Sequence, residues 1–137
     1  MIPEELITAY REAKYVVLID DNEVVFRVGK SCDPINQLLK DQSSKTAFFI
    51  TAHNPKGEVM TEDKNKNLHE DLLQDMRSRS LSFFEGYGTD DEEKWGREKS
   101  LLILGISKND ADKMAKKYQQ NAYIWIEENQ NTELVIM

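Results

Sequence analysis

The sequence predicts an α+β domain in which a mixed, largely antiparallel sheet of about six to seven strands packs against about four helices. The length of 137 residues suits a single domain, residues 1–137, with its own hydrophobic core. Hydrophobic residues make up 39% and charged residues 31%, a balance typical of ordered globular chains. Segments with a helical period alternate with short apolar runs, and turn residues join some of these runs as hairpins. These three observations define the expected class.

The first elements follow from local patterns. Residues 3–13 are expected to form a helix, because apolar residues recur at spacings of four and three. Two apolar runs within residues 15–28, separated by polar turn residues, predict a β-hairpin. Asp33 is a natural N-cap and Pro34 a natural first helical residue, so a short helix should follow and end near residue 42.

The middle of the chain predicts a buried strand and a longer helix. Residues 46–52 are almost continuously apolar, which is typical of a strand covered on both faces. Apolar residues recur every four positions over residues 68–76, so we expect a helix there, opened by Asn67 and Glu70 as a capping-box-like pair. Residues 81–84 predict another strand.

The last third contains a loop, a strand, a helix and a hairpin. Residues 86–99 show neither period and are expected to form an exposed loop. A second continuous apolar strand should occupy residues 101–106. Ser107 and Asp110 then form a capping box that opens a helix. Alternating residues around a polar turn predict a final hairpin over residues 121–136.

The net charge and the cysteine content restrict the classes of partner and the cellular compartment that we expect. The formal net charge of −7 opposes phosphate binding, so nucleic acid is not an expected partner, whereas a basic protein surface is compatible with it. The single cysteine and the acidic, amphipathic N-terminus predict a cytoplasmic protein without a secretory signal. Signal-less export to a host cell would leave the same features. No apolar run approaches a membrane span, so no membrane partner is expected.

No recognised catalytic, cofactor or metal motif is found. The Gly86 and Gly88 pair lacks the other glycines that a phosphate-cradling loop needs. One cysteine and two histidines, without HExxH or CxxC spacing, do not suit a zinc site. We therefore expect no cofactor and no metal, and we interpret His53 and His69 as ordinary surface histidines.

Two further features have weak chemical potential. Cys32 precedes a helix N-terminus, where the dipole would favour a thiolate, but no partner base is identifiable and a small residue in a turn is the favoured interpretation. The acidic run at residues 90–93 lacks the spacing of a calcium loop. It is expected to be a solvated electrostatic patch.

Polar residues gather at the ends of the two most apolar strands. Thr51 closes the first and is followed by Asn54, while Glu98 and Ser100 precede the second and Trp95 lies just upstream. Strand ends commonly border ligand crevices. The competing interpretation is structural: Asn54 would satisfy loop backbone, Glu98 would pair with a nearby cation, and Trp95 would cover the core.

Several short motifs occur in order over roughly residues 8 to 136: TAHNP from Thr51, Asn67 before a Leu-rich helix, the Gly86 and Gly88 pair, Trp95 with Glu98 and Ser100, and Gln120 opening a strand. In their order and spacing they resemble an uncharacterised bacterial family of small proteins, known as a domain of unknown function. The resemblance implies that Thr51, Asn54, Asn67, Glu98 and Gln120 belong to the family's pattern, through fold maintenance or through ligand binding.

Three functions are compatible with these features. The leading hypothesis is a non-enzymatic regulatory or binding protein that acts through protein contacts, restrains a partner enzyme and forms a homodimer, with Tyr87, Trp95 and Trp125 as interface anchors. The alternative is a small-molecule-binding protein or enzyme, in which Asn54, Asn67 and Gln120 orient a polar ligand and Glu98 acts as acid or base. The third is a structural subunit of a larger complex. The candidate binding residues are Thr51, Asn54, Asn67, Trp95, Glu98, Ser100 and Gln120, with no catalytic residue assigned.

Overall fold

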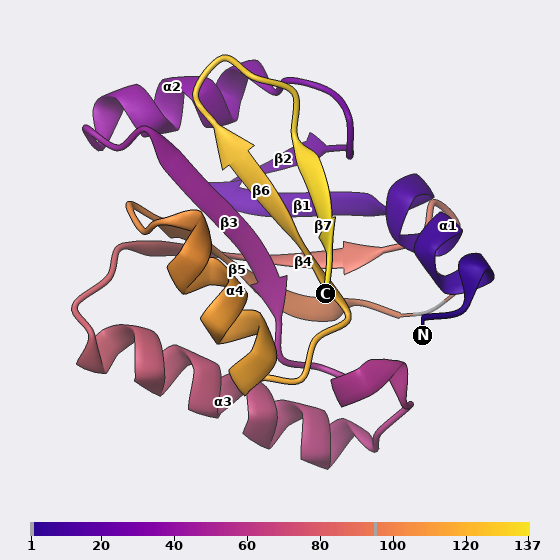
Figure 1. Ribbon diagram of the computed structural model, residues 1–137. Helices are drawn as coiled ribbons and strands as arrows, with labels where there is room; N and C mark the ends of the chain where they lie inside the picture. The colour runs from indigo at the N-terminus through magenta and orange to yellow at the C-terminus, as the bar shows by residue number, and fades with distance from the viewer. Residues whose placement is uncertain (1, 95) are drawn as a thin grey trace.

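Seven strands form one sheet with helices on both faces in the computed structural model, which describes residues 2–94 and 96–137 (Figure 1). The elements are α1 (Glu4–Glu12), β1 (Lys14–Ile19), β2 (Asn22–Phe26), α2 (Asp33–Asp41), β3 (Thr46–Thr51), the short 3-10 turn η1 (Pro55–Gly57), α3 (Glu62–Ser78), β4 (Phe83–Thr89), β5 (Glu98–Leu104), α4 (Lys108–Lys117), β6 (Ala122–Glu127) and β7 (Glu133–Ile136). The predicted α+β class is confirmed.

The strands lie in the order β2-β1-β4-β5-β3-β6-β7. All six pairings between the described strands are antiparallel. The prediction of a largely antiparallel sheet therefore holds, but the parallel pairs expected of a mixed sheet do not occur among these strands. β5 is the middle strand and β3 lies beside it. The two most apolar runs of the sequence therefore occupy the interior of the sheet, where both faces are covered.

Each face of the sheet has its own hydrophobic core. Because side chains alternate along a strand, Phe48 of β3 packs with α3 and α4, whereas Phe49 packs with α2 on the other face. Tyr10 of α1 is partly buried against the same face as α2. The consecutive residues Phe48 and Phe49 thus belong to two different cores.

The helix starts show which capping predictions hold. Ser107 Oγ accepts a hydrogen bond from the backbone N–H of Asp110 at 3.1 Å, as the predicted cap of α4 requires. For α3 the prediction is wrong: Thr61 is the N-cap and accepts from Lys64 N at 3.1 Å, so Asn67 lies well inside the helix. The polar first turns of α3 carry no apolar period, so the apolar pattern alone placed the start too late.

α2 also begins one residue earlier than predicted. Cys32 occupies the N-cap position without a side-chain cap, and Asp33 and Pro34 are both helical. Pro34 is tolerated there because the first helical N–H groups have no partner within the helix. Asp33 instead places a carboxylate in the first turn, where the helix dipole favours it.

The predicted loop over residues 86–99 is wrong at both ends. Residues 86–89 continue β4, which pairs with β1 and β5, and Glu98 and Lys99 open β5. Two glycines remove the side chains that would have shown a strand period. A Cβ built on Gly86 would lie 2.1 Å from the Val16 carbonyl oxygen, so only glycine fits this position of the sheet.

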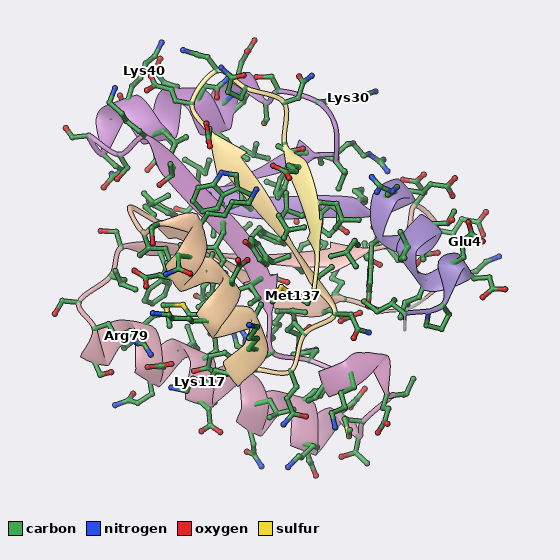
Figure 2. The ribbon with its side chains drawn as sticks, viewed as in Figure 1. Glu4, Lys30, Lys40, Arg79, Lys117 and Met137 are labelled. Carbon is green, nitrogen blue, oxygen red and sulfur yellow. The ribbon has the colours of Figure 1, made fainter. Side chains whose placement is uncertain are left out.

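Two proposed interface aromatics are part of the core. Tyr87 is 8% exposed and Trp125 is 5% exposed, so neither is available to anchor a partner surface. Trp95 lies outside the described residues. The surface instead carries charged side chains, among which Figure 2 shows Glu4, Lys30 and Lys40 at the periphery.

Across the described ranges, the helices are all too short or too polar to cross a membrane.

Candidate functional site

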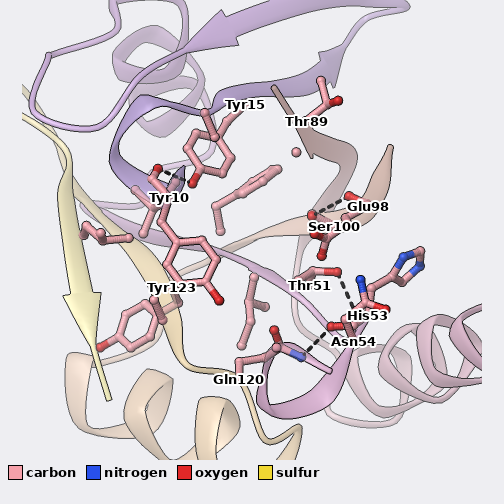
Figure 3. A pocket seen from close by; sticks show the side chains of 18 of the residues that line it. Tyr10, Tyr15, Thr51, His53, Asn54, Thr89, Glu98, Ser100, Gln120 and Tyr123 are labelled. Atoms are coloured by element: carbon pink, nitrogen blue, oxygen red, sulfur yellow. Dashed lines mark hydrogen bonds between the residues drawn. The ribbon is translucent and has the colours of Figure 1, made fainter. Parts of the chain in front are cut away.

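A cavity of about 330 Å³ lies between α1, the inner strands of the sheet and the segment that joins β3 to α3 (Figure 3). Val59 lines its mouth and is 91% exposed, so the cavity reaches the surface there. The volume is at the lower end of the ~300–1,000 Å³ typical of small-molecule sites. Five of the seven sequence candidates line it: Thr51, Asn54, Glu98, Ser100 and Gln120.

The strand register brings the polar candidates together. Thr51 pairs with Ser100 across β3 and β5, and Glu98 pairs with Gly88 across β5 and β4. Thr51, Glu98 and Ser100 line the cavity with Phe49 on one side of the sheet. The polar ends of two buried strands therefore meet at one place, as the sequence predicted.

Glycines in β4 leave room above the sheet. Gly88 lies between Glu98 of β5 and Tyr15 of β1 in the register, and a Cβ added to it would contact the Tyr15 ring at 3.3 Å. At Gly86 the same addition would lie 3.1 Å from Phe49 Cε1. The two aromatic rings thus lie over the glycines. Gly88 lines the cavity, whereas Gly86 lies outside its lining.

Aromatic rings form the apolar wall. Tyr15 packs edge-on against Phe49 with ring centroids 5.8 Å apart, and Phe26 stacks on Tyr15 at 5.6 Å. Tyr15 donates from its hydroxyl to the backbone oxygen of Tyr10 at 2.6 Å, which ties α1 to β1. Burial raises the pKa of both tyrosines, so their hydroxyls remain neutral donors.

The rim after β3 is held by a pair of asparagines. Asn54 adopts a left-handed conformation, with φ of 49°, and its backbone N–H donates to Asn65 Oδ1 at 2.9 Å. Its side-chain oxygen accepts from Asn65 Nδ2 at 3.0 Å and from Met60 N at 2.9 Å. Asn54 therefore fastens this segment onto the first turn of α3, which is the structural role considered for it.

Two other polar residues also support backbone. Thr51 Oγ1 donates to Lys99 O at 2.7 Å and accepts from His53 N at 3.0 Å. Gln120 Nε2 donates to the carbonyl oxygen of His53 at 3.1 Å and to that of Tyr118 at 3.2 Å. These bonds fix the rim in place and leave the amide oxygen of Gln120 without an intramolecular bond among the described residues.

Glu98 differs from its polar neighbours. Its carboxylate makes no hydrogen bond or ion pair with any described side chain, although its backbone oxygen accepts from Ser100 Oγ at 3.0 Å. Burial alone raises the pKa of the Glu98 carboxyl to about 6. The ion-pair role considered for Glu98 is therefore wrong within the described chain, and its carboxylate is available to a ligand or to a proton.

The two histidines are not surface residues as predicted. His69 is 3% exposed, and its ring lies edge-on to the half-buried ring of His53 with centroids 6.1 Å apart. Burial, His69 and Lys99 lower the pKa of His53 to about 4, and burial and Lys99 lower the pKa of His69. His53 Nε2 and His69 Nδ1 have no hydrogen-bond partner in the described chain. Both rings are therefore neutral at pH 7.

The other chemical candidates offer less. Burial raises the pKa of the Cys32 thiol, which opposes the dipole effect considered from sequence. Three exposed carboxylates of the acidic run form ion pairs: Asp91 with Arg27, Glu92 with Lys94 and Glu93 with Arg97. The described residues contain no group of three or more His, Cys, Asp or Glu that could hold a metal ion.

One candidate lies away from the cavity, and several cavity residues were not among the candidates. Asn67 is exposed on α3 and does not line the cavity, and the neighbouring asparagine that contacts the rim is Asn65. Tyr10, Tyr15 and His53 line the cavity but were not among the candidates, and His53 was interpreted as a surface residue. The Asn65 contact has no sequence signal, because it depends on the left-handed turn at Asn54. Trp95 lies outside the described residues.

Comparison with known proteins gives one match. No curated protein and no solved structure matches the chain. A family described as "Protein of unknown function (DUF3293)" matches residues 50–123, a shorter range than the resemblance over residues 8 to 136 suggested. This range contains the polar residues of the cavity from Thr51 to Gln120, whereas Tyr10, Tyr15 and Phe49 lie outside it. Since the match covers more than half of the 137 residues, the chain belongs to this family of unknown function.

Proposed function

We propose that this protein binds a small, partly apolar molecule in the cavity beneath α1. The observation that supports this most is the convergence of the strand-end residues Thr51, Glu98 and Ser100 on a cavity with aromatic walls. A cavity with an apolar body and a few polar groups at one end is the usual form of a small-molecule site. The polar end orients the ligand, and the rings of Tyr15 and Phe49 contact its apolar part.

Two further features support binding over a purely structural role. The Glu98 carboxylate is half-buried without a partner in the described chain, an arrangement that costs stability and is common at functional sites. Val59 presents an almost fully exposed apolar side chain at the mouth, which a bound ligand would cover. The alternative function, binding of a protein partner, has less support, because two of the three aromatic residues proposed as interface anchors, Tyr87 and Trp125, are buried.

The proposal is tested by fragment binding to the full chain. Neutral aromatic and aliphatic fragments at millimolar concentration should shift the backbone amide resonances of Ser100 and Ile124, which line the cavity. Ala122→Leu should reduce these shifts, because the half-buried Ala122 lines the cavity and a larger side chain would occupy it. Ala9→Leu on α1 adds the same side chain outside this lining and should leave binding unchanged.

Absence of cavity shifts with every fragment would contradict the proposal. Equal shifts in the wild type and in Ala122→Leu would place the binding elsewhere on the protein. Native mass spectrometry of freshly purified protein adds an independent measurement, since a retained small molecule should be released on unfolding and should be absent from Ala122→Leu.

A further inference from the structure

The chemistry of the cavity restricts the kind of ligand that it can hold. Among its described lining residues Glu98 is the one acid, and no lysine or arginine occurs. The other ionisable groups that line it, Tyr10, Tyr15, Tyr123 and His53, are uncharged at neutral pH. An ionised Glu98 therefore gives the cavity a single negative charge that no lysine or arginine of the lining balances.

This charge lies next to aromatic rings. Tyr10, Tyr15 and Phe49 line the same cavity as Glu98, and Figure 3 shows the labelled Tyr10 and Tyr15 across the cavity from Glu98 and Ser100. Ring faces attract organic cations, most strongly where water is excluded. A carboxylate with neighbouring aromatic rings is an environment that favours an ammonium group over an anion.

The alternatives fit less well. An anionic ligand would approach the Glu98 carboxylate with no lysine or arginine in the lining to oppose the repulsion. A bare metal ion lacks ligands, because the described chain offers no cluster of three suitable side chains. A neutral ligand could donate a hydrogen bond to the carboxylate but would leave its negative charge unbalanced in the cavity, whereas an ammonium group donates and also neutralises that charge.

We infer that the ligand is a small primary amine with an apolar body, whose ammonium group pairs with Glu98 while its body packs against Tyr15 and Phe49. The inference rests on the proposed binding function of the same cavity. The size also restricts the ligand: the cavity of about 330 Å³ is roughly twice the ~150 Å³ that accommodates one benzene molecule. A single aromatic ring with a short aminoalkyl chain meets this limit.

The test compares three probes of similar shape and different charge: phenethylamine, phenethyl alcohol and phenylacetate. Binding to the full chain is measured at neutral pH by calorimetry, with the cavity amides followed by NMR. We expect the amine to bind about tenfold tighter than the alcohol or more, since both can donate a hydrogen bond to the carboxylate but only the ammonium group also balances its charge. Phenylacetate should bind more weakly than the alcohol.

Two variants assign the effect to its residue. Glu98→Gln should bring the affinity for phenethylamine down to that for phenethyl alcohol, with the alcohol affinity unchanged. Glu58→Gln removes a carboxylate of the exposed segment beside the cavity, outside the lining, and should leave the preference for the amine intact. This control separates a contact with Glu98 from general attraction of amines to an acidic protein.

The outcomes distinguish the two proposals. If the alcohol shifts the cavity amides but the amine binds no tighter, or if Glu98→Gln keeps the preference, the amine inference is wrong and small-molecule binding stands. If none of the three probes binds, the inference fails, and the wider fragment screen decides the binding proposal. Should Glu98→Gln fail to fold, the order of the three probes on the wild type decides the question alone.

Discussion

The two faces of the sheet receive alternate side chains of the same strands, but one face is covered by a closed core and the other contains a cavity. On one face, α3 and α4 cover Phe48 and Ile50, which are almost completely buried. On the other, α2 covers one end of the sheet, and α1 covers the cavity at the other end. α3 spans 17 residues and buries four side chains, whereas α1 spans 9 residues and buries none. A short, shallowly packed helix over polar strand ends leaves a hollow where a long helix makes a core.

The adjacent residues Phe48 and Phe49 give the largest test of this difference. Phe48→Ala should lower the free energy of unfolding by about 3–5 kcal/mol, because it empties a closed core. Phe49→Ala should cost about 1 kcal/mol less, since one side of its ring already borders the cavity and has fewer contacts to lose. Denaturant unfolding measures both values. Equal costs would mean that the second face is packed as tightly as the first.

The two glycines of β4 provide a second matched pair. Gly86→Ala should destabilise the protein by at least about 2 kcal/mol, because the new Cβ would collide with the Val16 carbonyl oxygen. Gly88→Ala should cost less than about 1 kcal/mol, since only the Tyr15 ring must move by a few tenths of an ångström. It should nevertheless weaken fragment binding. Thermal unfolding of the two variants side by side would show whether the sheet tolerates a Cβ at Gly88, which lines the cavity, but not at Gly86, which lies outside the lining.

The pH dependence of stability tests how strongly the His53 ring is desolvated beside His69. The folded pKa of His53, about 4, is below its unfolded value of about 6.5, so its contribution is complete above pH 6.5 and is lost as the pH falls toward 4. Over that range the free energy of unfolding should fall by roughly 2 kcal/mol more in the wild type than in His53→Gln. Comparing the two proteins cancels the contribution of Glu98. Parallel pH profiles would show that the His53 ring is solvated.

Glu98 should show the opposite sign and a smaller effect. Its folded pKa of about 6 is above the ordinary value of about 4.5, so the carboxylate destabilises the fold above pH 6 and this cost disappears as the pH falls to 4.5. Glu98→Gln should therefore raise the free energy of unfolding at pH 7 by about 1–2 kcal/mol and change it little at pH 4. A loss of stability at pH 7 would reveal a hidden partner for the carboxylate. Urea titrations at the two pH values measure the difference.

The sequence predicted the helices and strands well where apolar side chains recur with a helical or strand period. The apolar runs of β3 and β5, the helix after Ser107 and the final hairpin all appear, although β5 ends at Leu104 rather than at residue 106. The prediction failed where side chains were missing or polar, at the glycines of β4 and at the first turns of α3. An apolar period appears only where one face of an element is buried. The exposed first turns of a helix therefore give no such period, and the start of the helix cannot be predicted from it.

The candidate site was predictable in its position and less so in its chemistry. The end of one apolar strand and the start of another implied that Thr51, Glu98 and Ser100 could meet, because antiparallel strands bring opposite ends to one edge. The isolation of Glu98 and the contact of the buried His69 with the half-buried His53 depend on segments that are far apart in the sequence. No local pattern encodes such long-range contacts.

The shallow packing of α1 also has a consequence for motion. The helix has no fully buried side chain and is tied down by few polar contacts, among them the 2.6 Å bond from the Tyr15 hydroxyl to the Tyr10 oxygen. Such segments open at a small fraction of the global unfolding free energy, so the amides of α1 should exchange with deuterated solvent sooner than those of β3 or β5. A molecule filling the cavity would touch Leu6 and Tyr10 from beneath and should slow that exchange, so α1 would gain order on binding.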